Sequence, residues 1–453
     1  MLRCNMFCLV QLARQYRDDL KQLWNGQVTF AALQLRRLAY ASFCLVLLCG
    51  LSTNLVAEDW TEFRGPLGNG HSKATDLPTN WSKEEHVAWR VDVPGKGWSS
   101  PVCLQRRLYL TTAVPSTEPA NSQSLRVLCL DIQSGSTLWD HEIFHTDGVR
   151  SPKIHPKNSF ASPTPYTDGK RLFVHFGTHG TACLDLEGKI LWKNEELIYG
   201  HVHGSGGSPV LVGDKLIVSC DGGDIQFVVG LDANTGKIAW KTPRTEPDVP
   251  KKFAFSTPLV LKQGQKTQVI SPGPGAVCSY DPETGKELWK VKYGTGYSVI
   301  PKPVFGNGLV YVCSGYDRPV LLAIRPDGQG DVTETHVAWK LEKGVPHSAS
   351  LLLIEKELYL ISDAGVATCL NAENGEQFWT QRIGGNFSSS PVYADGHIFL
   401  LSETGVTTIL KPGTSYEEVA KNELGEKTLS SYAIADGAIF VRTETGLFRI
   451  QSN

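Results

Sequence analysis

Histidine and aspartate residues with the potential to bind a ligand gather in one part of the sequence. Six of the twelve histidines fall between positions 145 and 203, and His201 and His203 come just before a loop of small residues, Gly204 to Gly207. If the His-Val-His segment is extended, both imidazoles face one side of the chain. Neutral imidazoles and carboxylates are common ligands of metals and polar molecules. We therefore predict a ligand pocket from the following residues: Lys157, Asn158, His175, His179, His201, His203, Asp221 and Asp224.

The same residues also have a plainer interpretation, in which histidines of glycine-rich loops make local hydrogen bonds. They match no recognised metal-ligand spacing, so the sequence gives no metal site. No Gly-x-Ser-x-Gly nucleophile motif is present, and Gly204-Ser205-Gly206 is too short for a nucleotide loop. We therefore assign no catalytic residue. We interpret three weaker polar clusters, at 297–298, 316–318 and 386–388, as turn or strand-start residues. The first and last of these clusters are expected at the channel mouth.

The net charge limits the class of binding partner, and the cysteine spacing limits the cross-links that the chain can form. The net charge is −2, and the part after residue 57 carries 38 basic and 44 acidic residues, a net charge of −6. Such a chain offers no broad basic surface for nucleic acid or anionic lipid. The seven cysteines of this part are isolated from one another and include no Cys-x-x-Cys motif. We expect them to be small buried hydrophobic residues on strands rather than disulfides.

The N-terminal residues 1–57 differ from the rest. Arg36 and Arg37 precede an apolar run, residues 38–56, and Ala57 is followed by an acidic pair. This order is typical of an export signal, although Leu55-Val56-Ala57 is an imperfect cleavage site. The run is also long enough to be an uncleaved membrane anchor. We predict two parts, a leader or anchor over 1–57 and one domain over 58–453.

A repeated unit dominates that domain. It consists of a Pro-led apolar strand, a second strand ending in Leu-Asp, a turn with Thr-Gly-Lys, and a tryptophan. Successive tryptophans are about 40–53 residues apart, the length of a four-stranded propeller blade. The unit starts are assigned to Pro101, Pro163, Pro209, Pro258, Pro303, Ala349, Pro391 and Tyr432. Eight starts predict an all-β, eight-bladed β-propeller.

The tryptophans are predicted to be structural rather than ligand-stacking. An aspartate caps each turn, a glycine supplies positive φ, and the indole packs on the next blade, which stabilises the fold by about 2–3 kcal/mol. The docking set comprises Trp89, Trp139, Trp192, Trp240, Trp289, Trp339 and Trp379. The seventh unit has no tryptophan, and Val419 lies near the expected place.

The last unit lacks its outer strand. Val87 to Val91, with Trp89, has the pattern of that strand, so we predict that it completes the last blade and leaves no open sheet edge. Trp60, Phe63 and Arg64, further upstream, are expected to wrap the outside of the ring.

These units resemble the repeat of quinoprotein-type propellers, with its Ala-x-Asp-x-x-Thr-Gly-x-x-x-Trp pattern. The match is best from Leu231 to Trp240 and covers nearly all of 60–451. The resembled family includes quinone-dependent alcohol dehydrogenases, which imply pyrroloquinoline quinone (PQQ) and calcium. It also includes the BamB propeller of outer-membrane assembly, which has no cofactor, and PQQ-like repeat proteins of planctomycetes.

The dehydrogenase parts are not found in the residues. Those enzymes carry adjacent cysteines over the quinone, and this chain has no Cys-Cys pair. We expect no cofactor and a monomeric binding or scaffolding propeller, exported to the periplasm or cell envelope, whose partner is a protein or polymer there. The alternative is a divergent PQQ- or metal-dependent oxidoreductase that uses the histidine-rich mouth.

Overall fold

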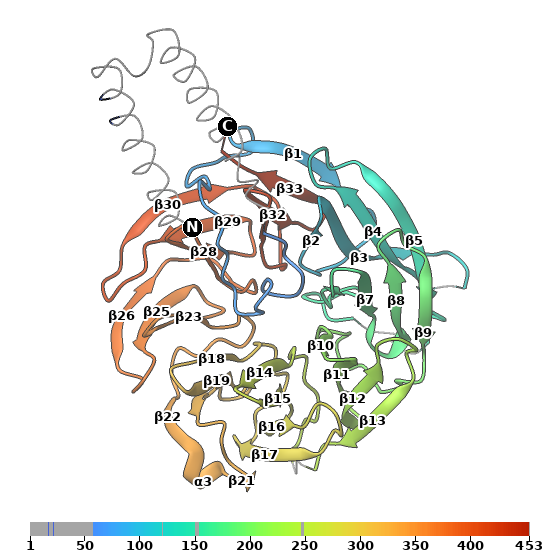
Figure 1. Ribbon diagram of the computed structural model, residues 1–453, viewed down its shortest axis with the longest axis vertical. Coiled ribbons are helices and arrows are strands. Elements are labelled where there is room, and N and C mark those ends of the chain that lie inside the picture. Colours follow the sequence, from blue (N-terminus) through green and yellow to red (C-terminus); the bar gives the residue numbers. More distant parts are fainter. Residues whose placement is uncertain are drawn as a thin grey trace. The chain divides into compact units, whose positions relative to one another are not determined.

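A computed structural model describes Arg17, Lys21 and residues 58–119, 121–149, 154–245 and 249–452. Apart from Arg17 and Lys21, the predicted leader or anchor over residues 1–57 lies outside the described residues. Residues 57–453 form one compact unit. Its strands build eight antiparallel sheets arranged as blades around a central axis (Figure 1). The predicted eight-bladed propeller is confirmed. Within the described ranges, no helix is long and apolar enough to cross a membrane.

Blades 1 to 4 follow one another along the chain, each running from an inner to an outer strand. Their strands are β2 (Val102–Leu104), β3 (Arg107–Pro115), β4 (Gln123–Asp131) and β5 (Thr137–His145); β6 (Tyr166–Thr167), β7 (Arg171–His175), β8 (Thr181–Asp185) and β9 (Ile190–Asn194); β10 (Val210–Val212), β11 (Lys215–Asp221), β12 (Gln226–Asp232) and β13 (Ile238–Pro243); β14 (Leu259–Gln263), β15 (Lys266–Pro272), β16 (Ala276–Tyr280) and β17 (Glu287–Lys292). A short 3-10 helix, η1 (Gly177–His179), lies between β7 and β8.

Blades 5 to 7 repeat this order. Their strands are β18 (Val304–Gly306), β19 (Leu309–Cys313), β20 (Leu321–Ile324) and β22 (Val337–Leu341); β23 (Leu352–Ile354), β24 (Glu357–Ile361), β25 (Val366–Asn371) and β26 (Gln377–Arg382); β27 (Val392–Ala394), β28 (His397–Leu401), β29 (Val406–Leu410) and β30 (Glu418–Glu423). The turn of blade 5 is enlarged by β21 (Gly330–Asp331) and the one-turn helix α3 (Thr333–His336). β21 pairs in parallel with β17, so this insertion extends blade 4 at its outer edge.

Blade 8 is assembled from both ends of the domain. β31 (Ala433–Ala435), β32 (Ala438–Arg442) and β33 (Gly446–Ile450) supply three strands, and β1 (Val87–Asp92) pairs antiparallel with β33 as the fourth. The predicted closure by Val87 to Val91 is thus confirmed. All seven described cysteines are free and buried, as the sequence predicts.

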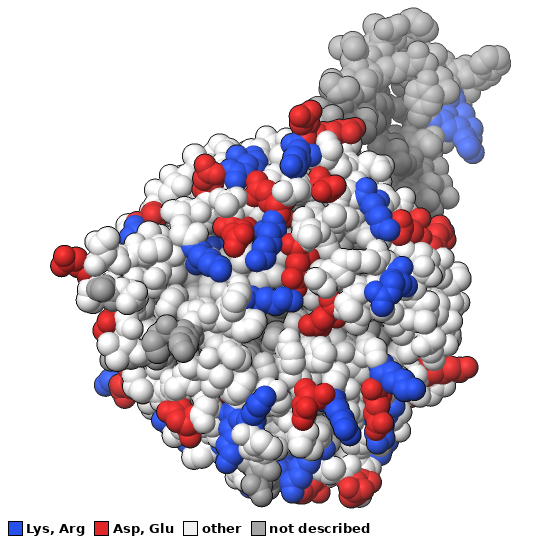
Figure 2. Space-filling model, turned by 180° about the vertical axis from the view of Figure 1, so that it is seen from behind, with Lys and Arg blue, Asp and Glu red and all other residues white. Residues whose placement is uncertain are grey.

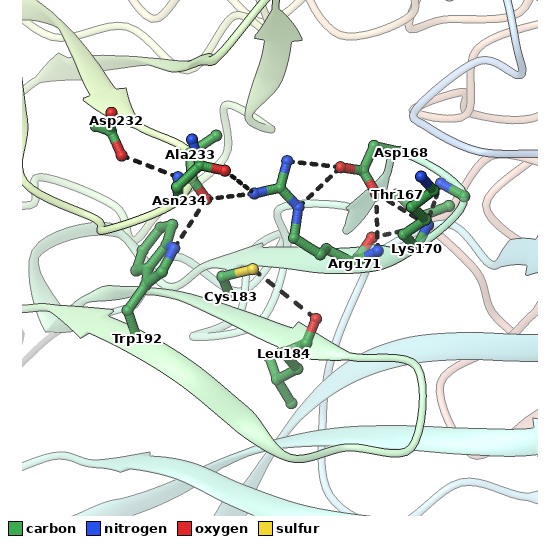
Figure 3. Close-up of polar contacts among 11 residues, drawn as sticks. Thr167, Asp168, Lys170, Arg171, Cys183, Leu184, Trp192, Asp232, Ala233 and Asn234 are labelled. Carbon is green, nitrogen blue, oxygen red and sulfur yellow. Dashed lines mark hydrogen bonds and ion pairs between the residues drawn. The ribbon is translucent and has the colours of Figure 1, made fainter.

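At five interfaces a blade is joined to the next by a tryptophan whose indole occupies the space above a turn glycine. In the turn after β12, the Asp232 carboxylate accepts the N–H groups of Asn234 and Thr235, and Gly236 has a φ of +73°. A Cβ on Gly236 would lie 2.4 Å from the indole of Trp192. The indole N–H of Trp192 donates to the Ala233 carbonyl at 2.9 Å (Figure 3). Glycine is therefore required here both for its backbone angle and for the room it leaves.

The same hydrogen bond recurs around the ring. The indoles of Trp89, Trp139, Trp192, Trp240, Trp339 and Trp379 each donate to a turn carbonyl of the following blade. Trp289 is different, because the turn of blade 5 is enlarged. Its N–H donates to the Gln268 side chain, and Gln268 in turn donates to the Pro326 carbonyl. Gln268 thus restores the link between blades 4 and 5.

Blade 7 receives its tryptophan from outside the blade. Ala420, not Val419, occupies the docking position, because it pairs with Ile409 as Trp379 pairs with Cys369 in blade 6. Trp81, upstream of β1, is buried and stacks on Phe399 of β28 at a centroid distance of 6.4 Å. Other docked tryptophans contact the aromatic residue of their own second strand in the same way. Trp81 therefore supplies the apolar contact of the missing docking residue, but its indole N–H has no acceptor among the described residues.

Replacing Trp81 should destabilise the ring as much as replacing a docking tryptophan within a blade. We expect Trp81→Ala and Trp379→Ala each to lower the free energy of unfolding by about 3–5 kcal/mol, because each leaves a large cavity at a blade interface. Urea unfolding followed by circular dichroism measures both. A loss below about 1 kcal/mol for Trp81→Ala alone would show that Trp81 is only a surface cover.

Candidate functional site

A ring of hydroxyl groups surrounds the central channel. The residue just before each inner strand donates its backbone N–H to the hydroxyl of the corresponding residue in the next blade, at 2.9–3.2 Å. This hydroxyl ring consists of Ser100, Thr164, Ser208, Thr257, Ser350, Ser390 and Ser431. Blade 5 has Lys302 in this position. There the step from blade 4 is made by the Ser256 hydroxyl, which donates to the Pro301 carbonyl at 2.9 Å.

The hydroxyl ring corrects two of the assigned unit starts. In blade 2 the ring residue is Thr164, so the unit starts at Pro165 and not at Pro163. In blade 6 it is Ser350, so the start is Leu351 and not Ala349. Both errors are shifts of two residues. A shift of two residues leaves each side chain on the same face of the strand. The alternation of apolar and polar residues therefore cannot reveal the error.

One mouth of the channel is closed by residues 58–73, which we call the plug. Trp60 exchanges both backbone hydrogen bonds with Cys103 of β2, and the Thr61 carbonyl accepts the N–H of Thr167. At the other end of the plug, Tyr393 of β27 donates its N–H to the Gly70 carbonyl at 2.8 Å. The plug therefore spans the inner strands of several blades, and its trace lies in the middle of the ring (Figure 1). The prediction that this segment wraps the outside was wrong.

Two buried cations hold the plug in place. The Lys302 ammonium, whose side chain is 2% exposed, pairs with Glu62 at 2.9 Å. The Arg64 guanidinium donates to the carbonyls of Asn69 and Leu351. Burial without a carboxylate partner lowers the pKa of Arg64 to about 9. The side chain of Lys302 anchors the plug instead of contributing a hydroxyl to the ring. This role explains why blade 5 has no Ser or Thr in that position.

Above the plug lies a cavity of about 540 Å³ that is open at the other mouth. Phe63 of the plug contributes to its lining. Its wall includes the hydroxyl ring and a second layer of residues that lie two positions earlier in each blade. This upper layer consists of Trp98, Ser162, Gly206, Phe255, Ile300, Ser348, Ser388 and Leu429. The volume is typical of sites for small ligands or for a segment of a larger one.

Aromatic rings form an arc around part of the open mouth. They run from His155 in the loop before blade 2 to His347 in the loop before blade 6, with neighbouring ring centroids 4.4–6.4 Å apart. The aromatic arc consists of His155, His203, Phe253, Tyr297, Tyr316 and His347. Such rings offer flat apolar faces for a ligand.

Two of the charged groups at the mouth are paired with each other, and a third, Lys251, donates to the hydroxyl of Tyr297. The Lys157 ammonium binds the Glu403 carboxylate of blade 7 at 2.7 Å, and the Ser388 hydroxyl donates to the same carboxylate. Asp363 accepts hydrogen bonds from the Ser348 hydroxyl and the His347 backbone. Burial favours protonation of Asp363, but the hydrogen bonds from His347 and Ser348 outweigh it and lower the pKa. Acidic and basic side chains are also interspersed over the face in Figure 2.

The structure divides the pocket residues predicted from the sequence. Lys157, Asn158 and His203 line the channel. His175 and His179 are buried in blade 2. His201 packs beside them, 5.8 Å from the ring of His179. Residues 201–203 form a bend rather than a strand, so the rings of His201 and His203 do not share one side.

The two aspartates of the predicted pocket are tied to local partners. Asp221 forms a buried ion pair with Arg244, with Nε to Oδ1 at 2.6 Å. Asp224 caps the neighbouring turn, where its carboxylate accepts the N–H groups of Gly200 and Ile225. Neither residue lines the channel cavity.

The channel contains residues that the sequence reasoning missed, notably Trp98, Phe253 and Phe255. Trp98 and Phe255 lie two positions before the hydroxyl-ring residue of their blade. That offset was the available signal, because residues two apart on an extended chain face the same side. Tyr297, Tyr316 and Ser388, given only as turn or strand-start residues, also line the cavity.

The channel residues do not fit the quinone and calcium arrangement of the dehydrogenases. Within the described ranges, no three His, Cys, Asp or Glu side chains gather in a group that could hold a metal ion. The described cysteines are buried singly in or beside the strands, away from the cavity lining. PQQ is a tricarboxylic acid, whereas the upper layer is uncharged and Ser348 and Ser388 are backed by carboxylates. The two lysines of the lining lie outside that layer, where Lys157 is paired with Glu403 and Lys251 donates to Tyr297.

The comparisons with known proteins fit this geometry. Residues 123–347 and 273–438 match the family model described as outer membrane protein assembly factor BamB, a PQQ-like repeat family. The chain belongs to this family. BamB from Moraxella catarrhalis has a similar fold, with a TM-score of 0.54 and 15% identity over 80% of this chain and 99% of that one. A europium-containing methanol dehydrogenase gives a TM-score of 0.57 and 14% identity over 86% and 90% of the two chains.

The curated relatives that match this chain are longer than it is. The dehydrogenase subunit of a quinone alcohol dehydrogenase from Komagataeibacter europaeus is 23% identical over 340 residues, 65% of this chain and 41% of the relative. A polyvinylalcohol dehydrogenase from a Pseudomonas species is 23% identical over 309 residues, 54% and 46% of the two chains. The chain thus spans less than half the length of the curated relatives it matches.

The buried histidines should make stability fall in mild acid. Burial lowers the pKa values of His175 and His201 to about 3, and the Thr178 N–H donates to His201, which requires a neutral ring. Between pH 6.5 and 3 the unfolded chain binds more protons, so the free energy of unfolding should fall by roughly 1 kcal/mol per histidine for each unit of pH.

Urea unfolding between pH 7 and pH 4.5 measures this slope. The double variant His175→Gln/His201→Gln should flatten it, whereas His145→Gln, at an exposed position, should leave it unchanged. An unchanged slope in the double variant would show that other groups control acid stability.

Proposed function

We propose that the protein is an exported, non-catalytic binding propeller that holds a segment of an envelope polymer or protein in its plugged channel. The observation that carries the proposal is a channel closed at one end by the chain's own plug and bordered at the other by the aromatic arc. A channel with one closed end does not conduct its contents through the ring, so a ligand enters and leaves through the open mouth and its inner end stops at the plug. The membership of the BamB-type family and the signal-like run at 38–56 support a place in the periplasm or envelope.

A divergent quinone-dependent oxidoreductase is the second candidate. The curated relatives are quinone dehydrogenases, and a cavity of about 540 Å³ is large enough for a cofactor. The residues that line it carry no cluster suited to a metal ion and no cysteine pair, so the binding role is preferred. No cofactor is required for the proposed function.

Site-specific photo-crosslinking in the producing cells tests the binding role. A benzoylphenylalanine in place of Tyr316, which lines the open mouth, should give a discrete adduct, whereas the same group in place of Tyr416, outside the cavity lining, should not. Ser388→Trp should abolish the Tyr316 adduct by filling the channel, while Ser116→Trp, on an exposed loop, should keep it.

An adduct that persists in Ser388→Trp would place the partner outside the channel and contradict the proposal. The enzyme candidate is tested separately by adding PQQ and calcium to the purified protein and following quinone absorbance and dye reduction with alcohols. Turnover there would overturn the non-catalytic role.

A further inference from the structure

We infer that the channel binds the end of a neutral oligosaccharide, with one sugar ring standing in the slot between Trp98 and Phe255. This inference rests on the proposed function, because it names the ligand class of the same channel. It is carried by the arrangement of apolar and polar residues in the upper layer, by the hydroxyl groups of the channel wall, and by the distribution of charge.

The upper layer has two apolar walls and two polar walls. In an eight-bladed ring, blades four apart stand opposite each other across the axis. Trp98 of blade 1 and Leu429 of blade 8 therefore face Ile300 of blade 5 and Phe255 of blade 4. A ligand between them meets apolar surface on both of its flat faces.

Small and hydroxylated residues occupy the remaining two sides. Ser162 and Gly206 of blades 2 and 3 face Ser348 and Ser388 of blades 6 and 7. A pyranose ring has this same division, with C–H groups on its faces and hydroxyl groups around its rim. Aliphatic C–H groups pack well on aromatic faces, and the rim hydroxyls need hydrogen-bond partners when they leave water.

The channel offers both donors and acceptors to such a rim. Ser348 and Ser388 give their protons to Asp363 and Glu403, so their oxygens are left as acceptors. The hydroxyl-ring oxygens accept backbone N–H groups, which leaves their own protons available to a ligand. Trp98 is only 6% exposed, and its indole nitrogen is buried out of reach of the cavity, so Trp98 offers a ligand apolar surface and no hydrogen-bond donor.

The charges favour a neutral ligand over an acidic one. The carboxylates of Asp363 and Glu403 lie directly behind the acceptor oxygens of the slot. Lys157 is already paired with Glu403, and the buried Lys302 is paired with Glu62. Lys251, the remaining lysine of the cavity lining, donates to the Tyr297 hydroxyl in the aromatic arc, outside the upper layer. A carboxylate in the slot itself would therefore lie beside Asp363 and Glu403 with no cation of the upper layer to compensate its charge.

The aromatic arc provides a route for the rest of the saccharide chain. Phe255 in the slot contacts Phe253 at a centroid distance of 5.7 Å, and Phe253 contacts Tyr297, which is followed by Tyr316 at the mouth. Successive sugar units leaving the slot can therefore pack on successive aromatic faces. The site binds a chain end rather than the middle of a chain, because the plug closes the opposite mouth.

Isothermal titration of the purified full-length protein with maltotriose, cellotriose and triacetylchitotriose tests the inference. At least one should bind, and trigalacturonate should bind at least tenfold more weakly. Trp98→Ala and Phe255→Ala should each raise Kd tenfold or more, and Ser388→Ala several-fold. Tyr416→Ala, outside the cavity lining, should leave Kd unchanged. Circular dichroism of each variant confirms that it is folded.

The inference is overturned if none of the three neutral trisaccharides binds, if trigalacturonate binds as well as they do, or if Trp98→Ala leaves Kd unchanged. The proposed function fails separately. If the trisaccharides fail while Ser388→Trp still abolishes the Tyr316 adduct, the channel is a binding site for another ligand class. If the adduct also persists in Ser388→Trp, both proposals fall.

Discussion

The propeller depends on one repeated interaction, the seating of a tryptophan from one blade over the glycine turn of the next. Without a Cβ, the glycine leaves a flat space, and the indole fills it while its N–H satisfies a turn carbonyl. This contact joins blades that share few other links at their outer edges. Where the local sequence cannot supply it, the chain uses substitutes: Gln268 bridges to the enlarged turn of blade 5, and Trp81 covers blade 7. Gln268 restores the hydrogen bond between blades 4 and 5, whereas Trp81 restores only the apolar contact, because its N–H has no acceptor among the described residues.

At the centre, a second set of contacts gives the ring its two unlike ends. The hydroxyl ring is nearly eightfold, and its one exception, Lys302, is the residue that holds the plug. The symmetric repeat thus builds a channel, and the departure from symmetry closes one mouth of it. The upper layer, by contrast, does not follow the eightfold repeat, because large apolar residues occupy it in blades 1, 4, 5 and 8 and small or hydroxylated residues in the other four blades.

The sequence was sufficient for the blade count and the closing strand because both follow from local patterns of fixed spacing. It failed where position depends on contacts that are distant in the chain. The plug has no repeat to mark it, and its path is set by pairs such as His71 with the Leu353 carbonyl, 282 residues away. Only three of the eight residues predicted to form the pocket line the channel, for a related reason. Counting alternate residues works in strands, but the bend at residues 201–203 sends neighbouring histidines to different environments.

The closing of blade 8 by β1 also has a consequence for the order of folding. β1 pairs with β33, whose residues follow it by about 350 positions, so the first strand of the domain has no partner until the end of the chain is present. Contacts of such long range form late, because the intervening chain must be ordered first. A complete ring therefore cannot assemble before the last strand has been synthesised, and the two ends of the domain are the last parts of the ring to be joined.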